Sequence, residues 1–148
     1  MPEDNTNTAS PNPVFQKIGY RTGSHGIIIG APEGDGNPLD PLAEGLVSLA
    51  TTDDLKVIEG DLDYIHLFVN NRAELAHHIG VLRDRLAPGG MLWVSWIKQA
   101  SAKRRGGLMG DLNESVIRKL ALSSGLVDVK VASLDSDWSA LKLVRRKH

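Results

Sequence analysis

Residues 63–96 constrain the fold most strongly, because they predict two buried strands joined by a helix. Both ends of the stretch, residues 63–69 and 88–96, are short runs of apolar, β-branched and aromatic residues, as is typical of strands buried on both faces. Between them runs one apolar stripe at helical spacing, formed by Leu75, Ile79, Leu82 and Leu86. Two strands joined by such a crossover lie parallel, with a right-handed connection. The stretch therefore predicts a βαβ unit.

The ends of this helix carry signals of their own. Asn71 can cap the N-terminus, and Glu74 three residues later completes a pattern like a capping box. Arg83 and Arg85 suit the negative C-terminal end of the helix. The motif Pro88-Gly-Gly90 then predicts the end of the helix and a turn into the next strand.

The composition is that of one globular domain. The chain has 148 residues, of which 41% are hydrophobic and 24% are charged. Residues 1–13 are polar and rich in Asn, Thr and Pro, so they predict a disordered tail ahead of a single domain at residues 14–148. The apolar runs are much shorter than the roughly 18 residues of a membrane span, and the N-terminus lacks the pattern of a secretory signal. We therefore expect a cytoplasmic protein that does not enter a membrane.

Three elements are expected between the tail and the central unit. Residues 26–30 are a short apolar run bounded by glycine, which predicts a first strand. A loop rich in Gly and Pro follows, and a short helix is expected at about residues 40–49. Residues 55–59 then predict a short second strand.

A helix and a hairpin are expected after the central unit. Residues 98–110 are polar and predict an exposed loop, after which Asp111 is expected to cap a helix that stops near Gly125. Three valines alternate with polar residues over 127–131, which predicts a strand with one buried and one exposed face. This strand and a last one at residues 138–144 should form an antiparallel hairpin.

The order of these elements, together with the motif Leu86-Ala-Pro-Gly-Gly90, resembles the methyltransferase variant of the Rossmann fold. In that family a helix ending in Leu-x-Pro-Gly-Gly lies between two central strands, and a hairpin closes one edge of the sheet. The resemblance implies an α/β fold with a mostly parallel sheet, helices on both faces and a C-terminal antiparallel hairpin.

A closer resemblance is carried by Lys17-Ile-Gly19, Ala31-Pro-Glu-Gly34 and the segments 62–69, 72–75, 86–96, 125–131 and 138–139. Together they are similar to an uncharacterised bacterial domain family whose function is unknown. Ile97 departs from that family's proline and Ala132 from its cysteine. The chain has no cysteine at all, which excludes disulfides, thiolate zinc sites and a cysteine nucleophile. The resemblance implies fold and bacterial origin but supplies no activity.

Ligands of open α/β sheets bind outside the carboxyl ends of the strands, near the point where the strand order reverses. The first loop and the ends of the later parallel strands should form that rim. In an alternative interpretation Trp96 fills the core and Lys98 is a solvated loop residue. We predict a ligand-binding cleft bordered by Gly30, Ala31, Pro32, Glu33, Gly34, Glu59, Asn70, Arg72, Trp96 and Lys98.

The first loop argues against the cofactor that the fold suggests. The methyltransferase resemblance implies an acidic residue at the end of the first strand and a Gly-x-Gly-x-Gly loop for S-adenosylmethionine. Here Ile27-Ile-Ile29 replaces the acid, and Pro32 removes a backbone donor from the loop. We therefore expect no cofactor, and a protein that binds an unidentified small molecule or protein partner without methyl transfer. The alternative is a minimal methyltransferase that binds S-adenosylmethionine with Glu59 at the ribose.

Other functions have less support. Residues 1–97 carry 6 Lys and Arg against 13 Asp and Glu, whereas residues 98–148 carry 11 against 5. This basic half, with Lys103-Arg-Arg105 and the C-terminal tail, keeps nucleic-acid association as a weaker alternative. The sequence has no P-loop, no serine-hydrolase motif and no zinc-protease pattern around its histidines, so we predict no catalytic residue and no metal site. His66 is expected to be a core histidine that is hydrogen-bonded to the backbone.

Overall fold

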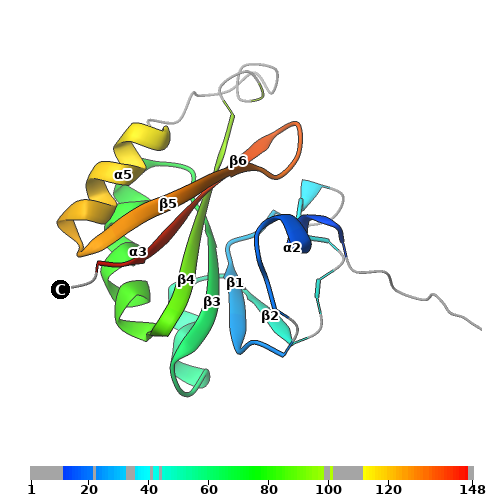
Figure 1. Ribbon diagram of the computed structural model, residues 1–148, viewed down its shortest axis with the longest axis vertical. Coiled ribbons are helices and arrows are strands. Elements are labelled where there is room, and N and C mark those ends of the chain that lie inside the picture. Colours follow the sequence, from blue (N-terminus) through cyan, green and yellow to red (C-terminus); the bar gives the residue numbers. More distant parts are fainter. Residues whose placement is uncertain are drawn as a thin grey trace, which may run out of the picture.

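The computed structural model describes residues 12–21, 23–32, 36–40, 42–43, 45–98, 101 and 112–146. Within these residues, six strands form one sheet in the order β2-β1-β3-β4-β6-β5 (Figure 1). The first four strands of that order run parallel, and β6 is antiparallel to both β4 and β5. The predicted fold class is confirmed. The strands are β1 (Gly26–Ile29), β2 (Leu46–Leu49), β3 (Leu62–Phe68), β4 (Leu86–Ile97), β5 (Leu126–Ser133) and β6 (Trp138–Arg145).

The central βαβ unit is present as predicted, with helix α3 (Arg72–Arg85) between β3 and β4. The side chain of Asn71 caps the helix, because its Oδ1 accepts a hydrogen bond from the backbone N–H of Glu74 at 2.8 Å. The apolar stripe of the helix is buried, with Leu75, Ile79 and Leu82 at most 3% exposed. The stripe anchors α3 on the sheet and fixes the direction in which the chain enters β4.

Glycine at position 90 lets β4 approach β3 closely. The pairing register shifts here, since Leu62 pairs with Leu86 but Tyr64 pairs with Met91. A Cβ atom on Gly90 would lie 2.9 Å from the carbonyl oxygen of Leu62, which is too close for any other residue. The predicted turn at residues 88–90 is therefore an irregularity inside β4.

The two faces of the sheet have different covers. Helices α3 and α5 (Glu114–Ser123) pack side by side on one face, which we call the helix face (Figure 1). The four-residue helix α2 (Val14–Lys17) and residues 36–40 and 42–43 cover the other, which we call the thin face. Apolar side chains fill the helix face, and the thin face is dominated by aromatic ones. The core is therefore split into two layers by the sheet.

Two predicted elements before β3 are wrong. Residues 46–49, expected to be helical, form strand β2 because Gly45 has a φ of +93° and Leu46–Leu49 pair with β1. Residues 55–59, expected to be the second strand, belong mostly to a 3-10 helix, η2 (Thr52–Val57). A capping box formed by Thr51 and Asp54 starts η2, and only Leu55 in it is buried.

The C-terminal hairpin is confirmed. The predicted alternation of buried valines and exposed polar residues over 127–131 is wrong. Val129 and Val131 are 53% and 51% exposed, because an irregularity between Asp128 and Lys130 shifts the register of β5. Asn113 caps α5 with its side chain, while Asp111, the predicted cap, lies outside the described residues.

The predicted N-terminal tail and exposed loop fall mostly outside the described residues. Residues 1–11 and most of residues 98–110 are in this category. Asn12 belongs to the folded part and not to a tail, because its side chain donates hydrogen bonds to the carbonyl oxygens of Pro38 and Asp40.

Candidate functional site

The strand order reverses between β1 and β3. The chain leaves β1 toward β2 on one side, and leaves β3 toward β4 on the other. Open α/β sheets bind ligands in the crevice that this reversal creates at the carboxyl ends of the strands. A cavity of 290 Å³ lies there, and we call it the switch-point pocket. Its lining residues are Ile29, Gly30, Ala50, Thr51, Leu67, Phe68, Asn70, Glu74 and His78.

Gly30 shapes the floor of this pocket. Its φ of +74° is rarely adopted by residues with a side chain, and a Cβ atom would lie 3.1 Å from the carbonyl oxygen of Phe68. Its backbone N–H donates to the carbonyl oxygen of Leu49 at 2.9 Å. The first loop is thereby held against the ends of β2 and β3, so the pocket stays small.

Two helix starts supply the polar wall of the pocket. Thr51 caps η2 by accepting a hydrogen bond from the backbone N–H of Asp53 at 3.1 Å. Glu74, in the first turn of α3, accepts one from the backbone N–H of Asn70 at 3.2 Å. Thr52 Oγ1 is joined to His78 Nδ1 at 2.9 Å, which ties η2 to α3. The polar groups are therefore held in place before any ligand binds.

The electrostatics of the pocket are simple. Burial lowers the pKa of His78, and His77 lowers it further, while Glu74 and Asp53 oppose this effect. The imidazole is consequently neutral at pH 7. Glu74 is the one acidic side chain among the described residues that line the pocket. The pocket therefore favours hydroxyl, amine or cationic groups over phosphates.

Some predicted rim residues do lie at this pocket. Gly30 and Asn70 line it, and half-buried Ala31 and Pro32 follow Gly30 directly. Arg72 is exposed at the start of α3, two residues from Asn70. Glu33 and Gly34 lie outside the described residues.

Two other rim residues are committed elsewhere. Trp96 is 9% exposed and packs in the core of the helix face. Lys98 Nζ donates to Ser133 Oγ at 2.6 Å and to the carbonyl oxygen of Asp135 at 2.8 Å. Trp96 therefore fills the core, as in the alternative interpretation of the sequence. Lys98 does not extend into solvent as that interpretation expects, because it fastens the end of β4 to the hairpin.

The predicted role of Glu59 at a ribose is contradicted by its position. Glu59 precedes β3, and its carbonyl oxygen accepts a hydrogen bond from His25 Nε2 at 2.9 Å, just before β1 begins. Both strands start there, so Glu59 lies at their amino ends, opposite the switch-point pocket. The error follows directly from placing the second strand at residues 55–59.

Three polar residues of the pocket, Thr51, Glu74 and His78, were missed from the sequence. Thr51 and its neighbours would have been included if β2 had been placed at residues 46–49. Glu74 was identified only as a capping residue, and His78 only as an unsuitable metal ligand. The spacing from Glu74 to His78, one helical turn, was the available signal that both side chains share a face of α3.

A second polar group is fully buried in the thin face. A hydrogen bond of 2.7 Å joins Tyr64 Oη to His66 Nδ1, and one of 2.6 Å joins His66 Nε2 to Ser95 Oγ. Burial lowers the pKa of His66 to about 3 and raises that of Tyr64 well above its usual range. His66 is a core histidine as predicted, but its partners are side chains instead of backbone. With no exposed surface, it has no contact with a substrate.

The described residues include neither a metal-binding cluster nor a membrane-spanning helix. They contain no group of three or more His, Asp or Glu side chains that could hold a metal ion. None of the helices there is both long and apolar enough to cross a membrane.

The fold is that of methyltransferases of known structure. The N-methyltransferase NodS of Bradyrhizobium japonicum WM9 superposes with a TM-score of 0.59 at 21% identity, over 90% of this chain and 92% of that one. Magnesium protoporphyrin IX methyltransferase of Synechocystis PCC 6803, with bound SAH, superposes with a TM-score of 0.57 at 14% identity, over 89% of this chain and 78% of that one. The CcbJ methyltransferase of Streptomyces caelestis superposes with a TM-score of 0.52 at 13% identity, over 72% of this chain and 66% of that one.

At these identities the likeness establishes the fold alone. No family model and no curated protein matches the sequence. The similarity to a bacterial domain family therefore stays a prediction.

Proposed function

We propose that this protein binds a small ligand in the switch-point pocket and does not transfer methyl groups. The observation that carries the proposal is a pocket at the reversal of strand order, with fixed polar groups on one wall and, among its described lining residues, a single acidic side chain, Glu74. Its volume of 290 Å³ is close to the lower limit of about 300 Å³ for small-molecule sites. The ligand is accordingly small.

A nucleoside such as adenosine fits this chemistry best. Ile29 and Leu67 offer apolar surface to a base, whereas Thr51, Asn70 and Glu74 offer hydrogen-bonding groups to ribose hydroxyls. SAM or SAH is bound in several similar structures, and both molecules contain an adenosyl group. The described lining residues include no Lys or Arg, which disfavours a nucleotide, because its phosphate would meet Glu74 instead.

A methyltransferase that uses S-adenosylmethionine is the second candidate. Glu74 favours it, because the sulfonium and ammonium groups of that cofactor are positively charged. Two features of the first loop oppose it. Pro32 has no backbone N–H to offer, and β1 ends in Ile29 and not in an acidic residue.

Calorimetric titration with adenosine and with S-adenosylmethionine separates the two candidates. We expect adenosine to bind at a single site with a Kd below about 1 mM, and S-adenosylmethionine to bind no more tightly. A cofactor that binds tenfold tighter than adenosine would favour the methyltransferase. If neither compound binds, the proposed nucleoside site is wrong.

The site itself is tested by Glu74→Gln with Glu59→Gln as its matched control. The first substitution keeps an oxygen that can accept from Asn70 but removes the charge, so it should weaken adenosine binding about tenfold. Glu59 lies at the other edge of the sheet, and its substitution should leave binding unchanged. Equal effects of both substitutions would contradict the site.

Two broader expectations belong to this proposal. A cytoplasmic location suits a protein that binds a soluble metabolite. Nucleic-acid association is the weaker alternative, and its main residues, 103–105, lie outside the described part of the chain.

A further inference from the structure

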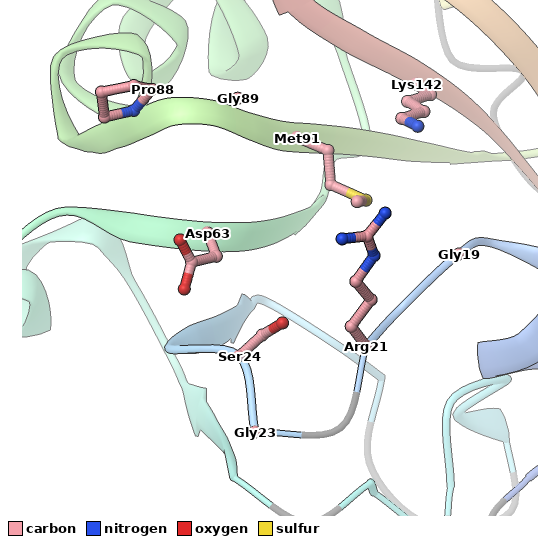
Figure 2. A pocket seen from close by; sticks show the side chains of 9 residues that line it. All are labelled: Gly19, Arg21, Gly23, Ser24, Asp63, Pro88, Gly89, Met91 and Lys142. Carbon is pink, nitrogen blue, oxygen red and sulfur yellow. The ribbon is translucent and has the colours of Figure 1, made fainter.

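A second and larger cavity lies on the thin face, at the edge opposite the switch-point pocket. Its volume is 820 Å³, within the range of about 300–1,000 Å³ that is usual for small-molecule sites. It is bordered by the starts of β3 and β4, by β6, and by four residues before β1, namely Gly19, Arg21, Gly23 and Ser24 (Figure 2). We call it the basic groove. Glycines at positions 19, 23 and 89 leave its walls without side chains.

Two cations from distant parts of the chain meet in the basic groove. Figure 2 shows Arg21 reaching from the segment before β1 toward Met91, with Lys142 beyond it on β6. Within the described residues, neither side chain forms an ion pair or a hydrogen bond, whereas most other basic side chains are bonded to carboxylates or carbonyl oxygens. A guanidinium and an ammonium in one concavity are the groups that proteins use to hold phosphate.

The sheet gives independent support for an anion site beside Lys142. Lys142 on β6 pairs directly with Lys130 on β5. Like charges in that arrangement repel and destabilise a pair of strands. Lys130 Nζ donates to the carbonyl oxygen of Lys17 at 3.1 Å. Lys17 is therefore a third basic residue in this part of the thin face. A bound anion beside Lys142 would relieve this repulsion.

The other walls indicate what else the ligand carries. Asp63 Oδ2 accepts a hydrogen bond from the backbone N–H of His25 at 3.1 Å, so its carboxylate is held at the edge of the groove. Its second oxygen can accept from a hydroxyl or an amine. Met91, between the cations and Asp63, offers an adaptable apolar surface. Asp63 also repels a continuous phosphate backbone, which disfavours a nucleic-acid strand.

We propose that the basic groove binds a small hydroxylated phosphate monoester, with its phosphate between Arg21 and Lys142 and its hydroxyl groups toward Asp63. This site is separate from the switch-point pocket, whose described lining residues include one acidic side chain, Glu74, and no Lys or Arg. The two sites are independent in the tests below, because the basic groove shares no lining residue with the switch-point pocket.

The test is an NMR titration of the full chain with ribose 5-phosphate, with uncharged ribose as the reference compound. Saturable shifts should appear at the amides of Gly19, Gly23 and Gly89, with a Kd of about 1 mM or lower, and ribose should bind at least tenfold more weakly. Equal binding of ribose, or shifts at the switch-point pocket alone, would overturn the proposal.

Arg21→Gln and Lys142→Gln should each weaken the binding of ribose 5-phosphate about tenfold. Lys119→Gln removes the same charge from exposed α5 on the helix face, and should leave the affinity unchanged. A similar loss in the control would show that only net charge matters, and would overturn the site. The circular dichroism spectrum of each variant reports whether it is folded, and the substituted side chains hold no other part of the described structure.

A single-stranded DNA oligonucleotide is titrated in parallel. We expect binding at least tenfold weaker than that of ribose 5-phosphate at about 0.15 M salt. Tighter binding of the oligonucleotide, lost in Arg21→Gln and Lys142→Gln, would replace the small-molecule proposal with a nucleic-acid surface.

Discussion

The two faces of the sheet achieve close packing by different means. On the helix face, two capped helices bury mostly leucine, isoleucine and valine side chains, which have no polar atoms to satisfy; Trp96 is the exception in that cluster. On the thin face, a single helical turn and an irregular segment cover large aromatic residues. Several of their polar atoms are bonded to defined partners, such as Trp93 Nε1 to the carbonyl oxygen of Ile18 at 3.1 Å, although Trp138 Nε1 has no partner within the described residues. The packing of the thin face therefore relies more on hydrogen bonds, whereas that of the helix face relies more on buried apolar area.

Among the predicted effects, acid should destabilise the protein most, through His66, which is buried in the thin face. The pKa of His66 is about 3 in the folded protein, against an ordinary value of 6.5, so the unfolded chain binds the proton more readily between these values. The stabilisation is complete above about pH 6.5 and is lost as the pH falls toward 3. The loss is about 2 kcal/mol by pH 5 and up to about 5 kcal/mol at pH 3.

Urea unfolding at several pH values measures this effect. His66→Gln should reduce the loss of unfolding free energy below pH 6.5 by that amount. His77→Gln, at an exposed position on α3, should leave the pH dependence of the unfolding free energy unchanged. The same pH dependence in both variants would rule out His66 as the cause.

The next largest effect concerns apolar packing. Leu82→Ala under α3 should cost about 3 kcal/mol, because the regular helix cannot collapse into the cavity that is left. Leu39→Ala on the thin face removes an equally buried side chain, but its irregular segment can relax, so we expect about 2 kcal/mol. Free energies of unfolding from urea titrations at pH 7 give the comparison. A larger loss at Leu39 would mean that the thin cover is the more rigid one.

A third substitution tests the tie that holds the thin cover. Asn12 Nδ2 donates to the carbonyl oxygens of Pro38 and Asp40 at 2.9 and 2.8 Å, and its Oδ1 accepts from the N–H of Val14. Asn12→Ala should cost about 1–2 kcal/mol and speed hydrogen exchange at Ile18 without affecting α3.

Asn71→Ala is the matched change on the helix face and should cost about 1 kcal/mol through loss of the cap. If Asn12→Ala leaves exchange at Ile18 unchanged, the side chain of Asn12 does not hold the cover.

The smallest effect should have the opposite sign. Lys142→Gln relieves the repulsion from Lys130 across β5 and β6, and should stabilise the protein by about 0.2–1 kcal/mol. Salt screens exposed charges, so the gain should shrink between about 0.01 and 0.5 M NaCl. Thermal unfolding at both salt concentrations measures it. A loss of stability at low salt would mean that the ammonium has a favourable partner.

The sequence predicts the regular half of the molecule better than the irregular half. The stripe of Leu75, Ile79 and Leu82 and the cap at Asn71 are local signals, so the βαβ unit is predicted correctly. Strand β2 has only four residues, and it exists because it pairs with β1, which no local pattern reveals.

The prediction of the site divides in the same way. Gly30 and Asn70 directly follow strands that were placed correctly, so both were predicted to lie at the rim. Glu59 was misplaced together with its strand, and Thr51 was missed for the same reason. The basic groove could not be predicted, because Arg21 and Lys142 are 121 positions apart and only the folded sheet brings them together.

The irregularity in β5 also bears on how the chain behaves at high concentration. As an outer strand, β5 presents backbone groups to which a strand from another molecule could add, next to the exposed Val129 and Val131. The extra residue between Asp128 and Lys130 bends this edge, and Lys130 adds a charge to it. Both features oppose the flat, apolar strand pairing from which amyloid-like aggregates grow. Straightening β5 by deleting Val129 would therefore endanger solubility more than folding.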